Sequence, residues 1–154
     1  MFKVNKLTDY ATVLLIEIAR RKVVQSSQHI AVQTGIPSPT VAKIMKSLNR
    51  AGLVASRRGA TGGYALERPA DQISLADIIQ AVEGPIALTA CADTSEEHCN
   101  IESVCPVQGK WNKANTAVRA ALSQVTLADM VADMSSFGIT PPPAAVSAPI
   151  SAAE

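Results

Sequence analysis

Residues 36–67 read IPSPTVAKIMKSLNRAGLVASRRGATGGYALE, and the main fold prediction rests on this stretch. Pro37 and Pro39 cannot lie inside a helix but can precede or begin one, and Gly52 is a suitable stop. We therefore predict a helix from about residue 39 or 40 to residue 51. Its apolar residues recur at helical spacing, and its basic residues recur at three and four positions elsewhere on the surface. The apolar stripe is Val41, Ile44, Met45 and Leu48, and the basic stripe is Lys43, Lys46 and Arg50.

A second, shorter helix is expected immediately before this one. The segment SQHIAVQT can begin after Ser26 or at Ser27 and end at Gly35, a residue that often terminates helices. Two helices joined by a short glycine-containing turn are typical of a helix-turn-helix unit. The second helix of such a unit enters the DNA major groove.

The pattern changes after Gly52. LVASRR is expected to form a strand, GATGG a flexible turn and YALE the returning strand. A hairpin directly behind a helix-turn-helix unit is a wing. At its tip Arg57 and Arg58 stand beside glycines, including Gly62 and Gly63, which let the backbone approach a phosphate closely.

The charge distribution agrees with an anionic partner. Residues 1–68 carry eleven Lys or Arg against three acids, a net charge of +8, whereas residues 69–154 carry three against ten, a net charge of −7. The overall charge of +1 conceals this asymmetry.

Four further helices are expected outside the helix-turn-helix unit. Thr8 can cap one running to about Arg21, Ser74 can cap LADIIQAVEG, and Thr126 can cap TLADMVADM. The remaining one spans roughly residues 109–124. Its apolar stripe has little core left to cover it in a small domain, so a second copy of the chain is expected there. That stripe consists of Trp111, Ala114, Val118, Ala121, Leu122 and Val125.

The expected architecture is thus mainly α with a small β-hairpin wing: a winged helix-turn-helix plus a long dimerisation helix. We assign residues 1–70 to the DNA-binding domain and residues 71–134 to a cofactor-binding loop and dimerisation helices. Residues 135–154, rich in Pro, Ala and Ser, are expected to be a disordered tail.

Several classes of protein are not supported by the sequence. No run of about 18 apolar residues predicts a membrane span, and the N-terminus lacks a secretory signal, which favours the cytoplasm. No phosphate loop, nucleophile elbow or convincing acid/base pair indicates an enzyme.

All three cysteines, Cys91, Cys99 and Cys105, lie within the segment TACADTSEEHCNIESVCP, residues 89–106. Clustered thiols in a reducing compartment favour a metal or cluster site over a disulfide. Zinc would need a fourth ligand such as His98, and spacings of seven and five exceed those of usual zinc knuckles. Longer spacings suit an iron–sulfur cluster, and three unconnected thiols are the simplest alternative. The spacing alone does not decide between zinc and an iron–sulfur cluster.

The sequence resembles the small bacterial winged-helix regulators that include the iron–sulfur assembly regulator IscR and the nitric-oxide sensor NsrR. The resemblance covers about residues 3–134 and rests on KLTDYA, RRGATGGYAL, ISLADIIQAVEG, the three cysteines and TLADMV. The opening LTDYATVLL is similar to regulators of the SUF iron–sulfur assembly operon. The resemblance implies a homodimer with one cluster per protomer, held by Cys91, Cys99 and Cys105.

The fourth cluster ligand differs within that family. IscR-like regulators use a histidine three residues after the third cysteine, where this chain has Gln108. NsrR-like sensors use an aspartate from the first helix of the partner subunit, and Asp9 occupies the matching position. The resemblance makes Asp9 the first choice and His98 the second, and analogy with the aspartate-ligated branch favours a 4Fe–4S over a 2Fe–2S cluster. From the residues alone, Asp9 can equally be a first-turn acid that interacts with its own helix dipole.

The expected function is a DNA-binding transcriptional regulator that responds to cluster or redox status, with the SUF operon as target. Ser38, Thr40, Lys43 and Lys46 would meet the major groove of a palindromic operator, and Arg57 and Arg58 would reach phosphates or the minor groove. The alternatives are a nitric-oxide-sensing repressor, a zinc-containing structural winged-helix protein and a small iron–sulfur electron carrier.

Overall fold

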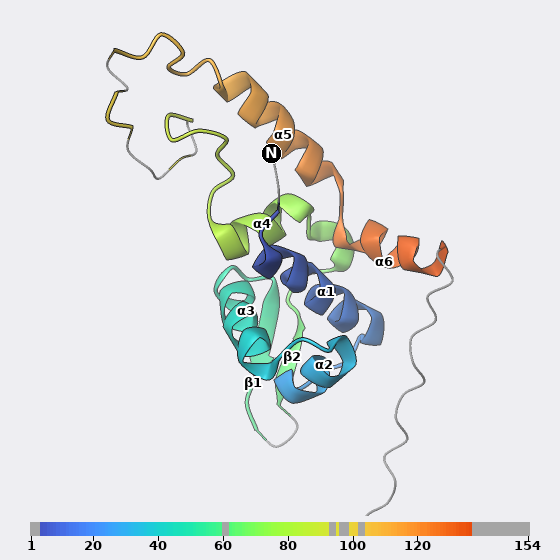
Figure 1. Ribbon diagram of the computed structural model, residues 1–154. Coiled ribbons are helices and arrows are strands. Elements are labelled where there is room, and N and C mark those ends of the chain that lie inside the picture. Colours follow the sequence, from blue (N-terminus) through green and yellow to red (C-terminus); the bar gives the residue numbers. More distant parts are fainter. Residues whose placement is uncertain (1–3, 60–61, 93–94, 96–98, 102–103, 137–154) are drawn as a thin grey trace, which may run out of the picture.

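The computed structural model describes residues 4–59, 62–92, 95, 99–101 and 104–136 (Figure 1). The described chain is mainly helical, with one antiparallel hairpin. Its elements in order are α1 (Lys6–Arg21), α2 (Ser27–Thr34), α3 (Ser38–Arg50), β1 (Val54–Arg57), β2 (Gly63–Leu66), the short 3-10 helix η1 (Ala70–Gln72), α4 (Leu75–Glu83), α5 (Asn112–Gln124) and α6 (Leu127–Ser136). The predicted class, a winged helix with a small hairpin, is confirmed.

One hydrophobic core lies between α1, α2, α3, α4 and the start of the hairpin. The apolar face of α1 supplies Leu14, Leu15 and Ile18, and α3 supplies the whole predicted stripe from Val41 to Leu48. Ile73, Ile78 and Leu127 from later in the chain are also fully buried in this core. Residues on both sides of the predicted domain boundary at residue 70 therefore share one core.

The helix ends mostly follow the predicted caps, with one error at α1. Ser26 accepts a hydrogen bond from the His29 amide and caps α2, and Gly35 ends that helix at φ 70°. At α1, however, Asn5 is the cap, because its side chain accepts from the Leu7 amide. The prediction that Thr8 caps α1 is wrong: Thr8 lies inside the helix and is 2% exposed.

The starts of α4 and α6 are tied to one another. Ser74 and Asp77 exchange hydrogen bonds as a capping box, and Thr126 does the same with Asp129. Backbone bonds from Leu75 to Val125 and from Leu127 to Ile73 then join the two caps. The hydrogen bonds from the Thr126 amide and hydroxyl lower the pKa of Asp129, because they stabilise its ionised form.

Helix α5 lies against α4 at one end of the molecule, away from the core (Figure 1). It begins at Asn112, three residues later than predicted. Within it only Asn115 is buried, and the flanking Trp111 and Val125 are 47% and 38% exposed. Of the predicted apolar stripe, Trp111, Ala121 and Val125 are therefore exposed, and Ala114, Val118 and Leu122 are partly buried.

Two further sequence predictions are a disordered C-terminal tail and the absence of a membrane-spanning helix. Most of the predicted tail, residues 137–154, lies outside the described residues. Within the described part of the chain, no helix combines the length and apolar character that crossing a bilayer requires.

Candidate nucleic-acid interface and cysteine site

Helix α3 presents a basic face opposite its buried stripe. Lys43, Lys46 and Arg50 are exposed, Ser38 is exposed at the helix start, and Thr40 is half-buried in the first turn. The helix begins at Ser38, one or two residues before the predicted start, with Pro39 in its first turn. The amphipathic sequence thus leaves the predicted DNA contacts on the face that does not pack.

The hairpin places its arginines beyond the packed part of the sheet. β1 pairs with β2 from Val54–Leu66 to Arg57–Gly63. Val54 is buried, whereas Arg57 and Arg58 are exposed. At the turn, Gly62 donates its amide to the Gly59 carbonyl at 2.9 Å. A side chain at Gly62 would meet the Arg57 carbonyl oxygen at 2.4 Å, so this glycine is required by the turn itself.

Gly63 has a role that sequence reasoning missed. The backbone of Gln25, in the loop between α1 and α2, forms a two-bond bridge with Tyr64, with N···O distances of 3.0 and 2.8 Å. A β-carbon on Gly63 would lie 2.3 Å from the Gln25 carbonyl oxygen and 2.8 Å from the Ser26 nitrogen. Only glycine permits this approach, which attaches the wing to the helix-turn-helix unit.

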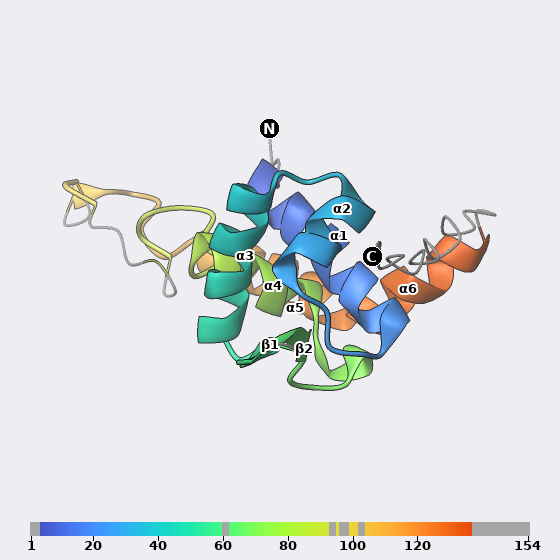
Figure 2. The same ribbon diagram turned by 90° about the horizontal axis from the view of Figure 1, so that it is seen from below.

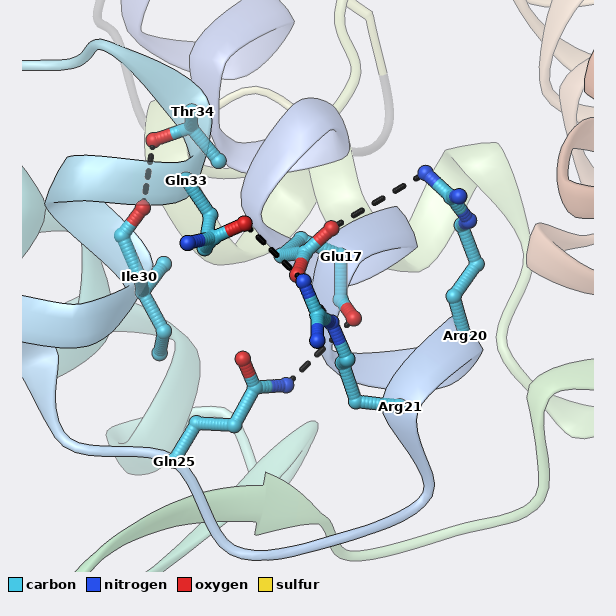
Figure 3. A network of polar contacts seen from close by, with 7 residues as sticks. All are labelled: Glu17, Arg20, Arg21, Gln25, Ile30, Gln33 and Thr34. Atoms are coloured by element: carbon cyan, nitrogen blue, oxygen red, sulfur yellow. Dashed lines mark hydrogen bonds and ion pairs between the residues drawn. The ribbon is translucent and has the colours of Figure 1, made fainter. Parts of the chain in front are cut away.

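A buried polar network fixes the same loop from the helical side (Figure 3). Glu17 is 8% exposed and pairs with Arg21 at 2.9 Å and with Arg20 at 3.9 Å. Arg21 also donates to Gln33 of α2 at 2.9 Å, and the side-chain amide of Gln25 donates to the backbone carbonyl of Glu17 at 3.4 Å. These contacts connect α1 and α2 to the loop whose Gln25 bridges to the wing.

The three cysteines belong to the segment between α4 and α5. Figure 1 shows the described part of this segment at the end of the molecule away from β1 and β2. Cys91, Cys99 and Cys105 are all partly buried free thiols. The Cys91 sulfur lies 3.5 Å from the Thr89 hydroxyl. Among the described residues, no three His, Cys, Asp or Glu side chains are grouped closely enough to bind a metal ion.

The proposed fourth ligands have different surroundings. Asp9 is exposed in the first turn of α1, and Gln108 is exposed just after the third cysteine. His98 lies outside the described residues. The donor set, three free thiols within fifteen positions, fits a thiolate-bound cluster chemically. In the described part of the chain, these thiols are not grouped closely enough to bind one metal ion.

Two polar residues that no sequence pattern singled out anchor the entrance to this segment. Glu83, the last residue of α4, accepts hydrogen bonds from the Thr8 hydroxyl and, at 3.2 Å, from the Asn5 amide. Asn115 of α5, 3% exposed, accepts from the Leu88 amide at 3.1 Å. Their significance depends on contacts between residues 27 to 78 positions apart, which no local pattern reveals.

Figure 2 shows α3 leading into the hairpin of β1 and β2. A helix with an exposed basic face, a hairpin with exposed arginines at its turn and a shared core define a winged-helix DNA-binding protein. Residues 4–133 match the Rrf2 family, described as "Iron-dependent Transcriptional regulator". This chain belongs to the Rrf2 family, whose members are transcriptional regulators and not enzymes.

Individual relatives agree with that assignment. Protein rrf2 of Nitratidesulfovibrio vulgaris is 33% identical over 135 residues, covering 86% of this chain and 89% of the relative. CymR, the global cysteine regulator of B. subtilis, has a similar structure, with a TM-score of 0.66 and 29% identity over 86% of this chain and 98% of CymR. IscR of T. potens gives a TM-score of 0.65 and 28% identity over 92% of this chain and 94% of IscR.

Proposed function

We propose that this protein is a homodimeric regulator that binds a palindromic operator and responds to the state of an iron–sulfur cluster, with the SUF assembly operon as its target. The single observation that carries the proposal is the separation of two sites in one fold. The first site, here called the reading head, consists of the exposed basic face of α3 and the arginines of the hairpin. The second is the segment between α4 and α5, which contains three free thiols and lies away from the hairpin strands. The target operon rests on the resemblance of LTDYATVLL. Action on chromosomal DNA would place the protein in the cytoplasm.

Two elements of the reading head, α3 and the hairpin, would contact different parts of the DNA. Thr40, Lys43 and Lys46 would enter the major groove with Ser38 at the helix entrance, where base-edge contacts select sequence. Arg57 and Arg58 would bind phosphates or the minor groove and supply affinity that depends on salt. Gly62 and Gly63 would allow close approach of the wing backbone, in addition to their roles within the hairpin.

The cluster would be held by the thiolates of Cys91, Cys99 and Cys105, with Asp9 of a second subunit as fourth ligand. We favour a 4Fe–4S type. When bound, such a cluster supplies chemistry that iron supply, oxidants or nitric oxide can alter. The exposure of Asp9 on the first turn of α1 leaves its carboxylate accessible to another copy of the chain.

The dimer would form around α5. Trp111 and Val125 flank this helix and are substantially exposed, and within the helix only Asn115 is buried. Covering the stripe with a second copy would remove this apolar area from water. Two heads related by a twofold axis would read half-sites about one helical turn apart.

A second function merits a test because CymR, described as a cysteine regulator, is as similar in structure as IscR. In that case the thiols would serve regulation without a cluster. A zinc site is the other outcome, whereas the family assignment favours a regulator over an electron carrier. Metal analysis separates the cluster, zinc and metal-free outcomes.

Replacing Cys91, Cys99 and Cys105 together by serine is expected to abolish iron and sulfide binding, because serine does not replace a thiolate ligand for soft metals. The measurement is iron, sulfide and zinc analysis with an absorption spectrum after anaerobic purification. An operator duplex is then selected from a random DNA library, and the affinity of the protein for it is measured with and without the cluster. A colourless wild-type protein with one zinc per chain would contradict the cluster, and equal operator affinity of the wild-type and triple variant would contradict cluster sensing.

Asp9→Ala is expected to leave cluster assembly possible but to speed cluster loss in air at least several-fold, since one ligand would be removed. The control is Asp71→Asn, an exposed acid on η1. The decay of cluster absorbance under air measures the effect. Identical decay rates for Asp9→Ala and wild type would remove Asp9 as a ligand.

A further inference from the structure

A carboxylate joins the end of α4 to the beginning of α1. One oxygen of Glu83 accepts both the Thr8 hydroxyl and the Asn5 amide, 75 and 78 positions away in the chain. Thr8 is 2% exposed, so its hydroxyl is shielded from water and depends on this acceptor and its own helix. The contact therefore fixes how α4 ends relative to the first turn of α1.

The chain that leaves this contact leads directly to the first cysteine. Gly84 follows with φ 90°, a conformation that favours glycine, and Ile86 is buried. Leu88 then donates its amide to Asn115 of α5 at 3.1 Å, and the Thr89 hydroxyl lies 3.5 Å from the Cys91 sulfur. Only eight positions separate Glu83 from Cys91, and two of the intervening residues, Ile86 and Leu88, are held to the protein.

The other side of α4 reaches the reading head. α4 packs against α1 and against α3, the helix that carries Lys43 and Lys46 (Figure 1). Ile78 of α4 is fully buried in the core that the α3 stripe also forms. A shift at the end of α4 would reach the DNA-reading helix through these packed side chains, because a close-packed core does not deform continuously.

We propose that Glu83 is the positioning residue that couples the state of the cysteine segment to DNA binding. Its carboxylate holds α4 and α1 in one arrangement, and a change at Cys91 acts on DNA affinity by shifting that arrangement. The inference rests on the proposed function for its physiological meaning, but the coupling itself requires only the contacts between Glu83, Thr8 and the start of the cysteine segment.

The test compares Glu83→Gln, Thr8→Val and the conservative Thr8→Ser with wild type. Two quantities are measured: the ratio of operator affinities with and without cluster, and the rate at which iodoacetamide modifies Cys91 in cluster-free protein, with and without operator DNA. The iodoacetamide rate at Cys91 can be measured without a cluster. Because thermodynamic linkage is reciprocal, DNA must alter the cysteine segment if the state of that segment alters DNA binding. Asp71→Asn is the matched control, since it also removes one exposed acid.

In wild type, both ratios are expected to differ from unity by about 5-fold or more, the lower range of allosteric coupling. Glu83→Gln and Thr8→Val should bring both ratios to within about twofold of unity, whereas Thr8→Ser and Asp71→Asn should retain the wild-type values. A merely structural Glu83 would lower the melting temperature and leave the ratios unchanged, which would overturn the proposal. If wild type binds no cluster, the proposed function fails while the Cys91 readout still decides the coupling.

Discussion

Lys43→Ala/Lys46→Ala protein should lose operator affinity by about 30-fold or more at low salt. Each lysine contact to a base or phosphate contributes roughly 1–3 kcal/mol, and about 1.4 kcal/mol corresponds to a factor of ten. Both side chains are exposed on α3 and make no ion pair among those seen in the described residues, so their removal should leave the fold intact. Fluorescence anisotropy with labelled operator duplex across a salt series measures the effect.

The salt dependence distinguishes DNA contact from a general charge effect. The slope of log affinity against log salt should decrease by about 1 for each phosphate contact removed. Lys110→Ala/Lys113→Ala is the control, because it removes the same charge from exposed positions just before α5 and in its first turn. If this variant remained dimeric and still lost as much affinity as the α3 variant, α3 would not be the recognition helix.

Gly63→Ala is expected to destabilise the protein by about 1–3 kcal/mol, the usual cost of forcing extra volume into a packed site. The new β-carbon would stand 2.3 Å from the Gln25 carbonyl oxygen, and backbone atoms cannot move aside as a flexible side chain can. Chemical denaturation followed by circular dichroism measures the free energy of unfolding. Operator affinity should fall as well, because the bridge between Gln25 and Tyr64 positions the wing.

A second glycine provides the control for Gly63. Gly52 has φ 70°, and no atom lies within 4 Å of the position that a β-carbon would take there. Gly52→Asn therefore adds a side chain into open space, at a conformation that asparagine tolerates, and its cost should stay below about 1 kcal/mol. Equal destabilisation by the two substitutions would show that close approach at Gly63 is not the cause.

Local sequence patterns were sufficient wherever one helix or hairpin determined its own boundaries. Ser26 and Gly35 marked α2, Ser74 marked α4, and the apolar stripe of α3 is buried as its spacing indicated. The error at α1 arises because Thr8 and Asn5 are both good capping residues. Asn5 takes the cap, and Thr8, inside the helix, bonds to Glu83 far along the chain.

Some residues of the candidate site could also be predicted from local sequence patterns, and others could not. The exposed cations of α3 and the wing could be selected because amphipathic periodicity separates packed from unpacked residues within one element. Four other features could not be predicted from the sequence, because they join residues that only the folded chain brings together. They are the Gln25–Tyr64 bridge, the network around Glu17 and the acceptor roles of Glu83 and Asn115. The spatial arrangement of the three thiols likewise cannot be predicted from their spacing in the sequence.

The winged helix-turn-helix, the division of charge and the location of the thiols could all be read from the order of residues, since each depends on a short segment. The attachment of the wing to the helices, and of the cysteine segment to the reading head, became visible only in the folded chain. Hydrogen bonds and close backbone approaches between distant segments exist only once the core has set the distances between them, and no local pattern contains those distances.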